Sequence, residues 1–307
     1  MPILVPTLLD IAKANGSDAL VGLIEETSRA VPEVTLCPAR TIKGMNYKTL
    51  VRTALPTVVF RNANEGAANS KGTYENRMYE TYILNPRWMS DKAVADVYED
   101  GAEAYIAMEA AGIMEAAMQL LGTQFYYGTV GDGSKGFPGL IGGYDNTNNV
   151  VDAGGTTAST GSSCWGVRFG PKDVQWIWGA NGQLSMSDVV MQSVVDGSGN
   201  MYTAYIQEIL AHVGLQVGSL RSLGRIKKLT ADAGCGLTDI KLGQLLTKFA
   251  TGFPPDVILC SRRSLEQLRA SRTATSVTGA PAPTPTEFEG IPIVPTDAII
   301  NTESLTL

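Results

Sequence analysis

The sequence has few of the side chains that enzymes use most for acid–base chemistry and metal binding. Among its 307 residues there is one histidine, His212. Histidine does much of the proton transfer and metal ligation in proteins, so a single copy excludes the commonest catalytic arrangements. The residues just before it, Ile209–Ala211, are apolar, and this context favours a packed histidine over a catalytic one.

Cysteine is also scarce, and its four copies lie far apart. Cys37, Cys164, Cys235 and Cys260 form no Cys-x-x-Cys pair, and none is beside His212 in the sequence. We therefore expect buried free thiols, no metal site and no cofactor. The N-terminus lacks the basic region and cleavage site of a secretory signal. No run approaches the roughly 18 apolar residues of a membrane span, so we expect no membrane partner.

Charged residues make up 18% of the chain, against an average of about 25%. Lys and Arg number 24 and Asp and Glu 30, which gives a formal net charge of −6. Proteins that grip a nucleic acid duplex usually carry a basic excess, so such a tightly held ligand is disfavoured. The 44% hydrophobic content argues against disorder. Low charge and abundant glycine (33 residues) fit a chain with many tight bends that hides surface against neighbours.

Two polar stretches superficially match ligand-binding motifs. Gly131–Gly136 has the spacing G-x-G-x-x-G, but a predicted helix precedes it and Phe137–Gly139 cannot open a helix in the required register. Asp145–Asn149 resembles a calcium loop, but Thr147 stands where a ligand is needed and no glutamate occupies the twelfth position. We interpret both as loops. With no catalytic, cofactor-binding or metal-binding set of residues, we expect the protein not to be an enzyme.

Two β-like runs flank a polar tip in the first third of the chain. The first covers residues 47–61 and is broken once, at Pro56, and the second covers residues 73–84. The polar tip between them, residues 62–72, is rich in Asn, Gly and Ala. This pattern predicts a long hairpin. Because an isolated two-stranded ribbon is marginal in water, we expect it to lie on the same chain or on a neighbour.

A long segment of helical periodicity follows the hairpin. The spacing predicts a helix over Ser90–Leu121, with either of its first two residues as N-cap and Gly122 as its end. Such a helix is roughly 45 Å long. Gly101 and Gly112 inside it lower the helix propensity, which suggests close approach by another backbone.

The remaining segments predict a mixed α/β body. An earlier helical stretch covers residues 4–30, with Leu20, Leu23 and Ile24 at helical spacing. Residues 202–212 fit a strand or a helix equally well. The other predicted elements are loops and short strands over 128–163, strands at 164–169, 174–178, 256–260 and 291–294, helices at 238–250 and 264–272, and a flexible stretch at 273–286.

The order of these parts resembles the major capsid proteins of tailed bacteriophages, whose Hong-Kong-97 type fold is shared with encapsulin shells. Thr53–Gly66 is similar to the family's extended loop, and Ser90–Leu121 is similar to its spine helix. Tyr127–Leu140 resembles the glycine turn that leaves the spine helix. Asp256–Leu268 and Phe288–Val294 resemble the helix-and-strand block near the family's C-terminal end.

The resemblance implies an α+β fold in five parts. These are an N-terminal arm (1–45), an extended β-hairpin loop (46–85), the spine helix with the peripheral domain (86–140), an axial domain (141–285) and a C-terminal strand segment (286–307). The family's extended loop overlaps a neighbouring subunit. We therefore expect contacts between subunits at Arg61, Asn64, Glu65, Lys71 and Tyr74 of the loop and at Gly112 of the spine helix.

The function implied by the resemblance is structural. Such a protein self-assembles as pentamers and hexamers into an icosahedral shell, which encloses packaged phage DNA without sequence-specific binding. We expect a virion protein assembled in the host cytoplasm, with a separate scaffolding protein, a portal and a possible cement protein as partners. Two alternatives remain open: an encapsulin-type shell protein, and a soluble cytosolic enzyme that uses residues 164–270.

Overall fold

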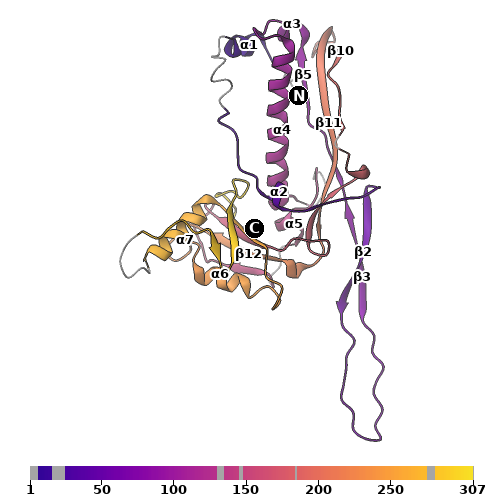
Figure 1. The fold of residues 1–307 in the computed structure, drawn as a ribbon, viewed down its shortest axis with the longest axis vertical. Helices are drawn as coiled ribbons and strands as arrows, with labels where there is room; N and C mark the ends of the chain where they lie inside the picture. Colours follow the sequence, from indigo (N-terminus) through magenta and orange to yellow (C-terminus); the bar gives the residue numbers. More distant parts are fainter. Residues whose placement is uncertain are drawn as a thin grey trace.

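The computed structural model describes residues 6–15, 25–129, 135–144, 148–183, 185–274 and 281–306. The molecule is elongated: a body of sheets and helices lies at its middle, a long helix and a β ribbon rise from one side, and a hairpin extends from the other (Figure 1). Helices and strands alternate irregularly along the chain. The predicted α+β class is confirmed.

The body contains a six-stranded sheet in the order β14-β15-β13-β7-β12-β6. Every residue of β7 and β13 is buried, as expected for strands covered on both faces. Helix α6 begins after Thr238, whose hydroxyl accepts a hydrogen bond from the backbone N–H of Lys241. The bounds are β6 Val150–Asp152, β7 Ser162–Val167, β12 Leu223–Leu229, α6 Asp239–Leu246, β13 Val257–Cys260, α7 Arg262–Ala274, β14 Glu287–Phe288 and β15 Ile291–Pro295. The strands and helices predicted in this region are confirmed, with ends shifted by a few residues.

A second sheet is organised around one long strand, β11 (Met201–Val217). Residues 202–212, for which the sequence fitted a strand or a helix equally well, are therefore part of a strand. Near its start β11 pairs with β10 (Val190–Val195) and β5 (Arg87–Asp91). Near its end it pairs with β8 (Val174–Trp178) and β4 (Tyr82–Leu84). Strand β1 (Ala39–Thr41) pairs with β8, and β9 (Ser185–Met186) pairs with β11. A strand of 17 residues that rises about 3.3 Å per residue is long enough to leave the body. It runs beside α4 almost to the end of the molecule opposite the hairpin (Figure 1).

The predicted continuous helix over Ser90–Leu121 is wrong at both ends. Its first residues belong to β5, and Asp91 caps only a short helix, α3 (Lys92–Ala95), by accepting a hydrogen bond from the Ala93 N–H. The chain then breaks at Gly101, whose φ of +89° is a conformation that favours glycine. The long helix, α4 (Ala102–Tyr127), passes through Gly122. It is about 39 Å long.

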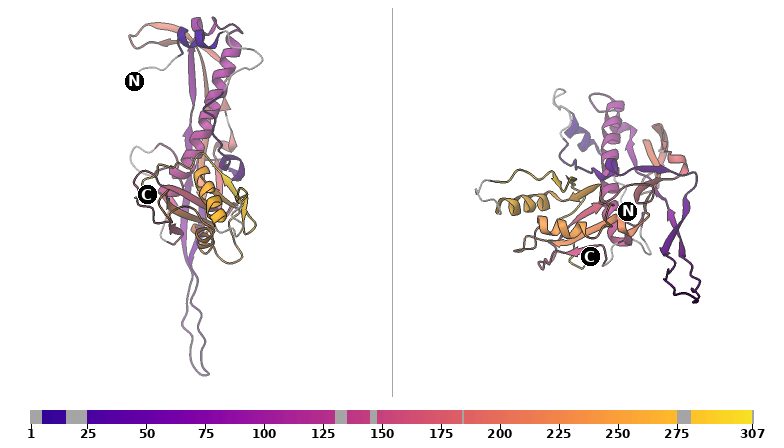
Figure 2. Two further views of the ribbon diagram at one scale, coloured as in Figure 1. Left: turned by 90° about the vertical axis from the view of Figure 1, so that its left-hand side faces the viewer. Right: turned by 60° about the horizontal axis from the view of Figure 1, so that its bottom comes forward.

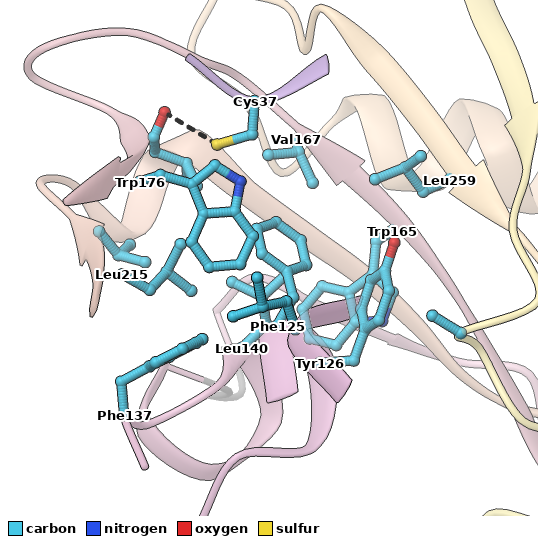
Figure 3. Close-up of a cluster of buried hydrophobic side chains, with 14 of the residues drawn as sticks. Cys37, Phe125, Tyr126, Phe137, Leu140, Trp165, Val167, Trp176, Leu215 and Leu259 are labelled. Atoms are coloured by element: carbon cyan, nitrogen blue, oxygen red, sulfur yellow. Dashed lines mark hydrogen bonds between the residues drawn. The ribbon is translucent and has the colours of Figure 1, made fainter. Parts of the chain in front are cut away.

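Gly122 does not end α4, because the turn that follows it is held in the core. Phe125 and Tyr126 are fully buried, and their rings contact Trp176 and Trp165 with centroid distances of 5.4 and 6.4 Å (Figure 3). Trp176 belongs to the β11 sheet and Trp165 to the six-stranded sheet. The last turn of α4 therefore joins the two sheets.

The hairpin is shorter than predicted. Strand β2 (Asn46–Ala54) pairs with β3 (Thr73–Glu80), while residues 55–72 form no strand and 82–84 belong to β4. The base of the hairpin is anchored: Tyr79 packs with Ile42 and Ile177, and its hydroxyl donates a hydrogen bond of 2.8 Å to the Val217 carbonyl.

The N-terminal helical prediction holds only in part. Helix α1 (Leu8–Ala14) has a capping box formed by Thr7 and Asp10, and residues 25–30 are not helical. Leu20, Leu23 and Ile24 lie outside the described residues, as do 131–134 of the glycine motif and 145–147 of the calcium-like loop. The short helical elements α2 (Glu33–Leu36), α5 (Leu140–Tyr144), η1 (Ala180–Gly182) and η2 (Leu220–Ser222) were not predicted.

The four cysteines and the single histidine lie in or beside packed parts of the fold. Cys37, Cys164 and Cys260 are buried free thiols, and Cys235 is a half-buried free thiol. His212 is half-buried in β11, opposite Ile83 of β4. In the part of the chain that the structure describes, no helix is both long and apolar enough to cross a bilayer.

Candidate assembly interface

Three of the predicted contact residues form the turn at the hairpin's tip. The Arg61 guanidinium donates a hydrogen bond of 2.7 Å to the Glu65 carbonyl, and the Glu65 carboxylate accepts one of 3.3 Å from the Asn62 N–H. Asn64 has a φ of +68°, which asparagine tolerates better than most residues. All three side chains are exposed. These hydrogen bonds within residues 61–65 fix the shape of the turn, and its outer surface remains exposed to solvent.

Two more predicted residues lie on the returning side of the hairpin. Lys71 is exposed. Tyr74 stands opposite Arg52 in the β2–β3 register, where its hydroxyl accepts a hydrogen bond of 3.1 Å and its ring lies 5.3 Å from the guanidinium carbon. This cross-strand pair stiffens the ribbon just below the point where strand pairing ends.

Gly112, the sixth predicted residue, lies on α4 and away from the loop. A Cβ added there would meet nothing within 4 Å, so the close approach of another backbone expected at Gly112 is not made within this chain. Of the two glycines in α4, Gly122 is the closely packed one, because a Cβ there would lie 2.2 Å from the Val31 side chain (Cγ1).

Within the described residues, the most exposed large apolar side chains lie in a segment whose exposure was not predicted from the sequence. We call Leu55–Phe60 the apolar loop segment: it follows β2, and Leu55, Val58 and Phe60 are 74%, 90% and 108% exposed. The sequence pattern predicted a strand over residues 55–61. One signal in the sequence argued otherwise, because the stretch that would pair with this apolar run is rich in Gly, Ala and Asn.

A groove lies between α4 and β4, with a volume of about 360 Å³. We call it the α4–β4 groove. Ile83 and Leu120 on its sides are 66% and 53% exposed, whereas Phe137 in its lining is 3% exposed. Other lining residues include Pro86, Ile113 and Lys135. Large apolar side chains thus remain open to solvent along the spine helix.

A buried polar cluster holds the C-terminal segment against the base of α4. Glu303 accepts hydrogen bonds from the Tyr127 hydroxyl at 2.5 Å and the Ser163 hydroxyl at 2.6 Å. Arg225 lies 3.3 Å from the Glu303 carboxylate and donates to the Ser163 hydroxyl at 3.0 Å. Burial and the Glu303 charge raise the pKa of Tyr127, so its hydroxyl stays a donor.

A buried carboxyl group joins the N-terminal arm to the same region. Glu33 is fully buried and accepts a hydrogen bond of 2.9 Å from the Thr296 hydroxyl. Its carboxylate also lies next to Gly122 of α4. Burial is the main cause that raises the pKa of Glu33 to about 7, with a further contribution from the negative charge of Asp297.

The arrangement is suited to holding copies together. Within the described residues, no group of three or more His, Cys, Asp or Glu side chains is placed to bind a metal ion. Among the described residues, exposed large apolar side chains occur on the hairpin and in the α4–β4 groove. An arm, an extended hairpin, a spine helix and a sheet-based body define the Hong-Kong-97 type capsid fold.

The profile of the family described as "Major capsid protein GP7" matches residues 14–306, and the chain belongs to this family. It is a major capsid protein. The family match favours the capsid function over the encapsulin alternative, and it implies a structural role in place of the enzyme alternative. Comparison with proteins of curated function found no match.

Solved structures agree on the fold. The chain is similar to a chain of bacteriophage Epsilon15, with 20% identity over 99% of this chain and 98% of that one and a TM-score of 0.73. It is also similar to a chain in the capsid of Myoviridae phage XM1, with 10% identity over 69% and 97% of the two chains and a TM-score of 0.50.

Proposed function

We propose that this major capsid protein self-assembles as pentamers and hexamers into an icosahedral shell that encloses packaged phage DNA. The observation that carries the proposal is the apolar loop segment, which projects from the body with Phe60 fully exposed. Exposed apolar surface of this kind marks a contact with another molecule. Repeated contacts between unlike surfaces of identical copies form closed assemblies when their rotation closes.

The five-part division supports this role as a working description: arm 1–45, extended loop 46–85, peripheral part 86–140, axial part 141–285 and C-terminal segment 286–307. In the shell, the loop overlaps a neighbouring subunit. Its polar tip residues Arg61, Asn64 and Glu65, with Lys71 and Tyr74, orient that contact, and Gly112 admits a neighbour close to the spine helix. Polar groups at such a rim contribute more to specificity than to affinity.

The remaining partners follow from the proposed shell. A separate scaffolding protein guides assembly in the host cytoplasm, a portal occupies one vertex, and a cement protein can reinforce the outside. The DNA is held without sequence-specific contacts. The net charge of −6 supports a wall along which DNA slides without adhering.

Electron microscopy of the purified protein, alone and co-expressed with its candidate scaffolding protein, tests the proposal. We expect closed icosahedral particles of uniform size. A monodisperse small species with no shells under either condition would overturn it. Icosahedral shells that enclose an enzyme and no DNA would instead support the encapsulin alternative.

A further inference from the structure

Two of the four cysteines face each other across neighbouring strands of the body. In the antiparallel register of β7 and β13, Cys164 lies directly opposite Cys260. Residues paired in this way have Cα atoms about 4.5–5.5 Å apart, and a disulfide spans Cα separations of about 4.4–6.8 Å. The backbone therefore already holds the two residues at a separation that a disulfide can bridge.

The two thiol side chains also point to the same face of the six-stranded sheet. Trp165 and Leu259, the adjacent pair in the register, face the buried cluster shown in Figure 3. Because side chains alternate along a strand, Cys164 and Cys260 face the opposite side. There they belong to a second cluster of buried side chains, to which helices α6 and α7 also contribute.

The other two cysteines have no such arrangement. Cys37 packs in the cluster of Figure 3, and Cys235 is half-buried after the end of β12. Both lie outside the strands of the described residues. In this part of the chain, strand pairing therefore places only Cys164 and Cys260 opposite each other.

Burial makes this pair slow to react. Both cysteines are 0% exposed. Burial raises the pKa of the Cys260 thiol to about 12, and burial together with the nearby Cys260 raises the pKa of Cys164. Because the thiolate is the reactive form, both thiols react slowly. The reducing cytoplasm of a host keeps such thiols reduced during folding, whereas oxidising conditions outside the cell do not.

We propose that Cys164 and Cys260 are a modification site, and that they form a disulfide within each subunit after the particle leaves the host cell. The inference rests on the proposed function for its timing, since a virion leaves the cytoplasm. In the reaction the two thiols lose two electrons and two protons, and one S–S bond forms. Dissolved oxygen, which is small and apolar enough to enter the core, takes up both electrons and both protons and becomes hydrogen peroxide.

The disulfide strengthens the body of each subunit without linking one copy to another. It closes a loop of roughly 100 residues, and crosslinks over long loops restrict the unfolded chain most. In both views of Figure 2 the body, which contains β7 and β13, is set apart from the tip of the hairpin. The crosslink therefore stabilises the folded subunit and leaves the projecting loop unchanged.

Thiol counting in assembled shells tests the proposal. Cys235→Ser removes the one native thiol that is not buried. Shells of this variant are purified with reductant, kept for several days in air-saturated buffer or with reductant, and then denatured and alkylated with N-ethylmaleimide. We expect the air-exposed sample to lose two of its three thiols, and mass spectrometry to find the Cys164 peptide linked to the Cys260 peptide. On a non-reducing gel the protein should remain a monomer.

Two core variants in the same Cys235→Ser background form a matched pair. Cys260→Ala should keep both of its remaining thiols in air, and Cys37→Ala should lose both. Air-exposed Cys37→Ala subunits should melt about 5 °C or more above the reduced ones, whereas Cys260→Ala subunits should melt alike in both states. The linked peptide in the first experiment needs no core variant, so it decides the question even where Cys260→Ala fails to fold.

The possible outcomes separate this inference from the proposed function. Retention of all three thiols in shells and in unassembled subunits would overturn the inference and leave the proposed function intact. Loss of thiols in Cys260→Ala, or a linked peptide that contains Cys37, would also overturn it, because a different pair would then react. Failure of the natural sequence to form shells would overturn the proposed function, whereas a Cys164–Cys260 link in unassembled subunits would still support the modification site.

Discussion

Arg225 and Glu303 form an ion pair of 3.3 Å in which the two side chains are 1% and 2% exposed. Arg225 lies on β12, and Glu303 lies in the last described segment of the chain. The guanidinium also lies 5.3 Å from the Trp165 ring. The C-terminal segment is therefore part of the core and not a loose tail.

Glu303→Ala removes the carboxylate that faces Arg225 inside the protein. We expect a loss of about 3–5 kcal/mol in the free energy of unfolding, since the remaining buried charge loses its counter-ion. Urea unfolding of unassembled subunits measures it. The control is Glu266→Ala, which removes an exposed partner of Arg269 at 3.6 Å and should cost less than about 1 kcal/mol. Equal losses in the two variants would contradict the structural role of Glu303.

Stability should fall with rising pH because of Glu33. Its pKa is about 7 in the folded chain, against an ordinary pKa of 4.5 for the free group. The folded state therefore binds the proton more tightly than the unfolded state. This contribution to stability is fully present below pH 4.5 and is lost as the pH rises to 7. It corresponds to about 3 kcal/mol.

Glu33→Gln isolates that effect, because the amide oxygen can still accept the Thr296 hydrogen bond but does not titrate. We expect its unfolding free energy to change less than that of the natural protein between about pH 5 and about pH 8. Urea titrations of unassembled subunits at both pH values provide the comparison. Parallel pH profiles for the two proteins would show that Glu33 is not the cause.

The two glycines of α4 should respond oppositely to alanine. At Gly122 a Cβ would lie 2.2 Å from Val31 Cγ1 and 2.9 Å from Glu33 Oε1, so we expect Gly122→Ala to cost about 1–3 kcal/mol. At Gly112 the space is open, and Gly112→Ala should stabilise the isolated subunit by up to about 1 kcal/mol through helix propensity. Thermal melts of unassembled subunits test this: the melting temperature should fall for Gly122→Ala and rise for Gly112→Ala.

Gly112→Leu then tests the proposed contact at that position. We expect folded subunits but a reduced yield of shells, measured by sedimentation. Shells formed in normal yield would remove Gly112 from the interface.

Deleting Ala63–Gly72 should separate folding from assembly. The segment makes its described hydrogen bonds within the hairpin, so subunits should remain soluble with an unchanged melting temperature. Shells should be fewer or dissociate earlier on heating, because the proposed overlap of the loop with a neighbour is shortened. Equally stable shells from this deletion would show that the tip is not part of the contact.

Elements specified by local patterns could be predicted from the sequence. Strand β13 is a short apolar run, and Thr238 marks the start of α6 by a capping pattern. The errors came from tertiary packing: α4 continues past Gly122 because Phe125 and Tyr126 are anchored in the core. The groove and the Arg225–Glu303 pair join residues far apart in the chain, and no local pattern specifies such contacts.

The projecting apolar segment has a consequence for how a proposed shell grows. In the proposed shell, neighbours cover the apolar loop segments of copies in the interior of a growing patch, whereas segments at its rim stay uncovered. The uncovered apolar area therefore increases with the length of the rim. Its exposure to water costs free energy in proportion to that length, which is a line tension. Small patches, which have long rims for their size, tend to dissolve, and large ones gain most by closing. Closure of the proposed shell is therefore favoured by one short apolar stretch that its own chain does not cover.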